Sequence, residues 1–154
     1  MKRTFINQNS EKNIEEVGMG HLESRIEDFK RFMEARDLED AGDDLGSFYD
    51  YGLSFDYVEL GTFKPQEEDY FRYQLSWGGG SDEVRFFVDG TMEYVYLDWF
   101  CGVGFDVTRE DWAIWLKDWF SGGDMLNFQE KREGYDYYEQ LWQSEHEDEE
   151  DEEE

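Results

Sequence analysis

Short segments rich in Tyr, Phe and Val, each bounded by turn residues, fill the middle of the chain and predict β-strands. The expected strands are Ser54–Leu60, Tyr70–Trp77, Glu83–Val88 and Glu93–Phe100, the last extending as far as Val107. The turn sequences Gly78-Gly79-Gly80-Ser81 and Asp89-Gly90 are typical of β-hairpins. Neighbouring strands joined by such short turns predict an antiparallel meander.

A helical pattern precedes these strands. Between His21 and Asp37, apolar residues recur at spacings of four, three and four, which predicts one buried face of an amphipathic helix. The residues on that face are Leu22, Ile26, Phe29 and Met33. A turn starting earlier, near Ser10, is expected to be interrupted by Gly18 and Gly20, since glycine weakens helices.

A second helix is expected after the strands. Thr108 followed by Asp111 resembles a capping box, and a heavy apolar stripe comes next. The stripe consists of Trp112, Trp115, Leu116, Trp119 and Phe120, and Gly122-Gly123 is expected to end the helix. A weaker helical segment, Asn127–Gln143, is interrupted by Gly134. The predicted fold class is α+β, an antiparallel meander of four or more strands packed by an N-terminal helix and a Trp-rich C-terminal helix.

Composition adds a second property to this picture. The chain has 154 residues, of which 29 are aromatic, and a formal net charge of −27. High charge with few apolar groups is typical of disorder, whereas this many aromatic residues indicates a packed core. The last ten residues hold nine acids, so the first 144 still carry −18. We therefore expect one acidic domain, residues 1–144, followed by a disordered acidic tail, residues 145–154.

The sequence favours a cytoplasmic location. The N-terminal segment MKRTFINQNSEKN has no apolar run typical of a secretory signal, and no 18-residue apolar stretch is present to span a bilayer. An acidic surface is also repelled by anionic lipid headgroups. The single cysteine, Cys101, lies in an apolar run and is expected to be a buried thiol.

Signatures of catalysis and cofactor binding are scarce. The sequence has no Walker-type phosphate loop, no HExxH and no paired CxxC motif. With only His21 and His146, a nucleophile paired with histidine is disfavoured, and Asp40–Leu45 lacks the ligand pattern of a Ca²⁺ loop. We expect no enzyme activity, no catalytic or metal-binding residues and no cofactor. A small enzyme with an acidic pocket is a third alternative.

The Trp-rich stripe has two interpretations. Helical spacing favours core packing, and the net charge of −27 disfavours stacking on nucleic-acid bases, because binding to a polyanion requires basic groups. Aromatic residues left at the surface are expected to anchor a protein interface. Candidates for that role are Tyr49, Tyr51, Tyr135, Tyr137 and Tyr138.

Acidic residues form the candidate binding surface. With Leu22 turned inward, Glu23, Glu27 and Glu34 lie on one flank of the helix, and Glu23 and Glu27 are about 6 Å apart, comparable to successive phosphates on a nucleic-acid strand. The full set of candidate partner-binding residues is Glu23, Glu27, Glu34, Asp37, Glu39, Asp40, Asp43, Asp44, Glu67, Glu68 and Asp69. A solvated acidic face, or adaptation to high salt, is the competing interpretation.

In size and composition the chain resembles the DNA-mimic inhibitors of phages and plasmids, which block restriction, CRISPR or DNA-repair proteins. The stretch Tyr70–Cys101, with FRYQLSWGGGSDEVRFF and EYVYLDWF, is similar to uncharacterised acidic proteins of mobile elements. The resemblance implies a non-enzymatic DNA mimic that evades host defence by occupying a basic nucleic-acid-binding protein, such as a CRISPR effector or restriction nuclease, without binding nucleic acid or membrane itself. An immunity protein, antitoxin or acidic chaperone that neutralises a basic partner without mimicry is the alternative, and homodimerisation is left open.

Overall fold

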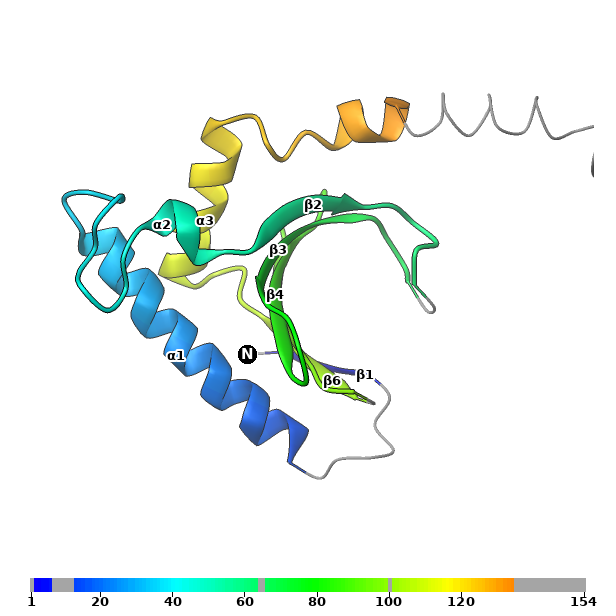
Figure 1. Ribbon diagram of the computed structural model, residues 1–154. Coiled ribbons are helices and arrows are strands. Elements are labelled where there is room, and N and C mark those ends of the chain that lie inside the picture. The colour runs from blue at the N-terminus through cyan, green and yellow to red at the C-terminus, as the bar shows by residue number, and fades with distance from the viewer. Residues whose placement is uncertain (1, 7–12, 64–65, 100, 135–154) are drawn as a thin grey trace, which may run out of the picture.

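A six-stranded antiparallel sheet forms the centre of the computed structural model, with its helices on one face (Figure 1). The structure describes residues 2–6, 13–63, 66–99 and 101–134. The elements in chain order are β1 (Arg3–Ile6), α1 (Ile14–Glu34), α2 (Phe48–Tyr51), β2 (Ser54–Val58), β3 (Tyr70–Ser76), β4 (Ser81–Phe86), β5 (Met92–Leu97), β6 (Gly102–Asp106) and α3 (Asp111–Gly122). The strand order is β1-β6-β5-β4-β3-β2, so the α+β class is confirmed.

Strands β2 to β6 form the predicted meander, with two differences. The segment expected as one long strand from Glu93 divides into β5 and β6, which pair antiparallel with Leu97 opposite Gly102. The Asp98 N–H donates to the Cys101 carbonyl at 2.7 Å beside this pair. Strand β1 was not predicted, since its four residues show no turn signals or alternation. It pairs with β6 from the far N-terminal end of the chain.

Helix α1 runs unbroken from Ile14 to Glu34, so the expected interruption at Gly18 and Gly20 is wrong. Gly18 is buried against the sheet, where a β-carbon would lie 2.5 Å from Val103 Cγ1. A residue without a side chain lets the helix approach the sheet closely there. Tertiary packing therefore outweighs the low helix propensity of glycine.

On the predicted face of α1, Leu22 and Phe29 are buried and Ile26 is half-buried, whereas Met33 is not buried. Phe32 is buried, whereas Met33 is 37 % exposed. The reason lies in α2, which the sequence did not predict: Phe32 packs edge-on against Phe48 and Tyr51, at ring-centroid distances of 5.2 and 5.1 Å. Aromatic partners on this short helix cover Phe32 and leave Met33 outside.

Helix α3 carries the predicted Trp-rich stripe but begins later than expected. Trp112, Leu116 and Phe120 are buried, and Trp112 stacks on Phe29 of α1 at 5.2 Å. The capping-box prediction is wrong, because Glu110 is the N-cap and the Thr108 hydroxyl donates to the Asp106 carboxylate instead.

The predicted C-terminal features are in part beyond the described residues. Helix α3 ends at Gly122 as expected, and residues 128–134 are helical. The remainder of the segment Asn127–Gln143, the tyrosines Tyr135, Tyr137 and Tyr138, and the tail 145–154 lie outside the described part of the chain.

A buried ion pair fixes α1 to the sheet. The Asp82 carboxylate on β4 is 1 % exposed and accepts from Arg25 Nε and Nη2 at 2.7 and 3.0 Å and from the Tyr94 hydroxyl at 2.6 Å. Arg25 also donates to the Tyr51 hydroxyl, which in turn donates to Asp28 at 2.6 Å. Tyr51 therefore belongs to this internal network, and its predicted role as a surface anchor is wrong.

Candidate protein-binding surface

Four glutamates form a row on the side of α1 that faces away from the sheet. They are Glu16, Glu23, Glu27 and Glu34, all exposed, and are called the acidic ridge below. At about 100° per residue they fall within roughly 40° of one another, opposite the buried Gly18 and Phe29. The row spans 18 residues, about 27 Å at 1.5 Å per residue. The sequence predicted Glu23, Glu27 and Glu34 as part of this surface but not Glu16, because the predicted helix began at His21 whereas α1 begins at Ile14.

The negative charge of the acidic ridge is not balanced by ion pairs in the described part of the chain. Among the described residues, none of its glutamates forms an ion pair, although the exposed Lys30 lies beside the row. Four of the arginines are instead bound to acids elsewhere. The pairs are Arg25–Asp82, Arg72–Asp56, Arg85–Glu83 and Arg132–Asp69. Arg3 binds Glu15 and Arg31 binds Asp44, so the arginines in these pairs are bound to acids outside the ridge.

The loop after α1, residues 37–44, continues the acidic surface. Its predicted members Asp37, Glu39, Asp40, Asp43 and Asp44 are all exposed. Two of the carboxylates shape the loop, since Asp37 accepts the Glu39 N–H at 2.9 Å and Asp40 accepts the Gly42 N–H at 3.3 Å. Asp44 receives two hydrogen bonds from Arg31, which lower its pKa to about 2 and neutralise much of its field.

The remaining predicted acids do not join this surface. Glu67 and Glu68 are exposed in the β2–β3 loop, which in Figure 1 projects on the other side of the molecule from α1. Burial raises the pKa of Glu68. Asp69 is 5 % exposed and is bound by Arg132 at 2.7 and 2.8 Å and by the Tyr57 hydroxyl, contacts that lower its pKa despite burial. Asp69 is therefore a buried structural carboxylate and has to be removed from the candidate surface.

The sheet face away from the helices carries a second charged arrangement that the sequence analysis missed. Directly paired positions on five adjacent strands place Asp56, Arg72, Arg85, Glu93 and Asp106 in one row. Arg85 bonds Glu83 at 2.8 Å and lies over the Tyr70 ring, while burial raises the pKa of Glu93. The available signal was the alternation of these charges with apolar residues along β4 and β5. Asp56, Arg72 and Arg85 in this row form ion pairs within the protein. We therefore interpret the row as a structural feature of the sheet and not as a binding surface.

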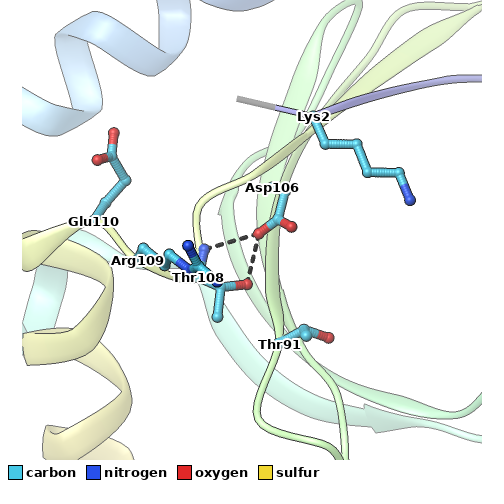
Figure 2. Close-up of a pocket in the computed structure, with 6 residues that line it drawn as sticks. All are labelled: Lys2, Thr91, Asp106, Thr108, Arg109 and Glu110. Carbon is cyan, nitrogen blue, oxygen red and sulfur yellow. Dashed lines mark hydrogen bonds between the residues drawn. The ribbon is translucent and has the colours of Figure 1, made fainter.

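A pocket of about 560 Å³ opens at the end of β6 (Figure 2). It is lined by Lys2, Thr91, Asp106, Thr108, Arg109 and Glu110. The charges of its two basic and two acidic side chains cancel. Asp106 accepts hydrogen bonds from the Thr108 hydroxyl at 2.6 Å and from the Thr108 N–H at 3.0 Å. These bonds lower the pKa of Asp106, which makes it a poor general base at neutral pH.

The cysteine and one of the two histidines lie in positions that the structure describes. Cys101 is buried, as expected, and the exposed His21 stacks on Tyr96 at 4.6 Å. Within the described residues, no group of three or more His, Cys, Asp or Glu side chains is placed to hold a metal ion. None of the described helices has the length and apolar character needed to cross a membrane.

Comparisons with protein-family models, with curated proteins and with solved structures found no match. A functional interpretation therefore depends on the surface of the chain itself.

Proposed function

We propose that this protein is a non-enzymatic inhibitor that imitates nucleic acid and occupies the basic groove of a nuclease or CRISPR effector. The observation that carries the proposal is the acidic ridge, a row of exposed and unpaired glutamates about 27 Å long. At about 3.4 Å per base step, that length corresponds to roughly eight base pairs. The exposed acids of residues 37–44 extend the same surface beyond the end of α1.

Electrostatics explains how such a surface would work. Glu23 and Glu27, one helical turn apart, stand about 6 Å from each other, a spacing close to that of successive phosphates. Glu16 and Glu34 each lie two turns, about 10.5 Å, beyond this pair. A basic groove attracts this row over a distance of about 10 Å at moderate salt, which accelerates association. Binding is then expected to compete with DNA or RNA, to weaken steeply with salt and to inhibit stoichiometrically.

The test compares two variants of equal charge. The first carries Glu16→Gln, Glu23→Gln, Glu27→Gln and Glu34→Gln, and the second carries Glu67→Gln, Glu68→Gln, Glu130→Gln and Glu133→Gln at exposed sites elsewhere. Both are titrated against a panel of purified restriction nucleases and CRISPR effectors in cleavage assays. For the inhibited target, the first variant should need about tenfold more protein for half-inhibition, and the second less than about threefold.

Equal weakening by the two variants would show that net charge alone matters and would contradict mimicry by the ridge. Inhibition at a protein-to-target ratio far below one, or tight binding of the protein to DNA, would also contradict the proposal.

One observation supports a second candidate function, that of an immunity protein, antitoxin or acidic chaperone. Large apolar side chains are exposed close to the acidic loop, among them Tyr49 at 58 % and Leu53 at 54 %. Nucleic-acid grooves do not require such anchors, whereas protein-specific interfaces use them. A bound partner that is not displaced by competing duplex DNA would favour this second function.

A further inference from the structure

A small aromatic pocket lies where α2, the beginning of β2 and the end of α3 meet. Its volume is about 230 Å³, the size of one large side chain. The lining residues are Phe48, Tyr49, Gly52, Leu53, Ser54, Phe55, Tyr73, Trp119, Phe120 and Met125, of which six are aromatic. The pocket is distinct from the acidic ridge, which occupies the outer side of α1.

Three aromatic rings at this pocket, those of Phe48, Tyr49 and Trp119, pack against one another in tilted and edge-on arrangements. Trp119 lies 5.0 Å from Phe48 at 72° and 6.0 Å from Tyr49 at 59°, and Phe48 and Tyr49 are 6.1 Å apart. Tyr49 is 58 % exposed and Met125 38 %, so this side of the pocket is open to a visiting group. Indole and phenol faces carry negative quadrupole potential and attract cations within about 6 Å.

Acidic residues adjoin the aromatic lining. Asp50, Asp118 and Asp124 are exposed, and each directly follows or precedes a lining residue in the chain. None of the three lines the pocket itself, so their contribution is a negative field near it. In the described part of the chain, none of the three forms an ion pair. The lining itself includes no lysine or arginine among the described residues.

We propose that this pocket receives one arginine side chain of the protein partner. A planar guanidinium stacks on aromatic faces and is more weakly hydrated than an ammonium, so it suits an aromatic site with unpaired acids nearby in the chain better than lysine does. An apolar side chain would gain nothing from Asp50, Asp118 and Asp124. This inference rests on the proposed function, since it supplies the buried anchor that binding to a basic partner needs.

The pocket can be probed without knowing the partner. The full chain is titrated with N-acetyl-arginine amide, N-acetyl-lysine amide and N-acetyl-leucine amide, while the Trp119 indole and Met125 methyl resonances are followed by NMR. Arginine amide should shift both resonances and half-saturate at about one-third of the lysine concentration or less. Asp50→Asn combined with Asp118→Asn should weaken that response, and Glu67→Gln with Glu68→Gln should not.

Leucine amide binding as well as arginine amide, or no arginine response at either resonance, would overturn the inference. With a partner in hand, Tyr49→Ser should lower affinity about tenfold, because this exposed ring supports the site, whereas Trp77→Ser on the β3–β4 turn should leave affinity unchanged.

The two proposals fail in different ways. Loss of partner binding on neutralising the acidic ridge, together with no effect of Tyr49→Ser, would refute the arginine pocket and leave the proposed function intact. An arginine response at Trp119 in a protein that inhibits no nucleic-acid-binding target would refute the proposed function and keep the pocket.

Discussion

Gly18 of α1 lies directly over Val103 of β6, so close that a β-carbon on residue 18 would meet Val103 Cγ1 at 2.5 Å. The same β-carbon would stand 3.3 Å from Phe105 and 3.4 Å from Tyr96. One helix position without a side chain thus lies against three residues of the sheet. The distance between helix and sheet is set by this contact.

Replacing Gly18 by alanine should therefore destabilise the protein. The added methyl group overlaps Val103, and overpacking of this kind costs about 1–3 kcal/mol, more than the gain of up to about 1 kcal/mol in helix propensity. The free energy of unfolding, measured by urea denaturation, is the readout.

Gly20 provides the matched control on the same helix. A β-carbon there would meet nothing within 4 Å. Gly20→Ala should accordingly stabilise the protein by about 0.5–1 kcal/mol, since it reduces the conformational freedom of the unfolded chain. Stabilisation by both substitutions would contradict the close packing of α1 on β6.

Asp82→Asn should be strongly destabilising at neutral pH. Burial alone would raise the pKa of Asp82, but hydrogen bonds from Arg25, Ser76 and Tyr94 outweigh it and lower the pKa. Loss of the carboxylate charge leaves Arg25 partly buried without its counter-ion, a change that costs about 3–5 kcal/mol. Asp44→Asn, which removes the exposed partner of Arg31, should destabilise the protein far less, because solvent screens this surface pair.

The effect of Asp82 should also depend on pH in a defined direction. Its folded-state pKa lies below the unfolded value of about 3.9, so its contribution is complete above that value and declines as pH falls through the folded pKa. The stability difference between wild type and Asp82→Asn, measured from pH 7 to pH 2, should narrow in the acid range. A difference that stays constant across this range would contradict ionisation of Asp82 in the folded protein.

Neutralising the acidic ridge should raise stability while impairing function. Glu23 and Glu27 are like charges one turn apart, and such pairs destabilise a helix by about 0.2–0.5 kcal/mol. The four-glutamine ridge variant should melt at a higher temperature than wild type at low salt. The two melting curves should converge at about 1 M salt, where the screening length falls to about 3 Å. A lower melting temperature would mean that the glutamates contribute contacts to the fold.

Truncation after Ser144 should weaken partner binding without abolishing it. The deletion removes nine acids and leaves a net charge of −18 on the remaining 144 residues. Association should slow at low salt because long-range attraction falls, while dissociation should change little. Surface plasmon resonance separates the two rates, and complete loss of binding would place the function in residues 145–154.

Local patterns predicted most of the elements but not β1 or α2, and tertiary contacts decided where the predicted elements begin and end. The turn signals at Gly78–Ser81 and Asp89-Gly90 located two hairpins correctly, because Gly78, Gly80 and Gly90 adopt positive φ angles that few other residues tolerate. The extent of α1 could not be predicted, since Gly18 is favoured by its contact with Val103, a residue 85 positions away in sequence. Strand β1 was missed for the same reason, because it pairs with β6, about 100 residues later in the chain.

The candidate surface was predictable to a similar degree. Helical periodicity placed Glu23, Glu27 and Glu34 outside, and all three are exposed. Sequence alone could not separate Asp69 from its exposed neighbours, because its burial depends on Tyr57 and on Arg132, 63 residues later. The composition gives the number of acidic residues, whereas the fold determines which of them pair with an arginine and which stay unpaired.

The pairing of β1 with β6 has a consequence for how the chain reaches this structure. Strands β2 to β6 join neighbours in sequence and can form as successive hairpins, whereas β1 pairs Arg3 with Phe105 and closes a loop of about 100 residues at a high cost in chain entropy. Strand β1 is made well before β6 and can pair only after β6 has formed. Until β1 docks, the backbone of β6 offers an open edge to other chains, so β1 protects that edge against self-association.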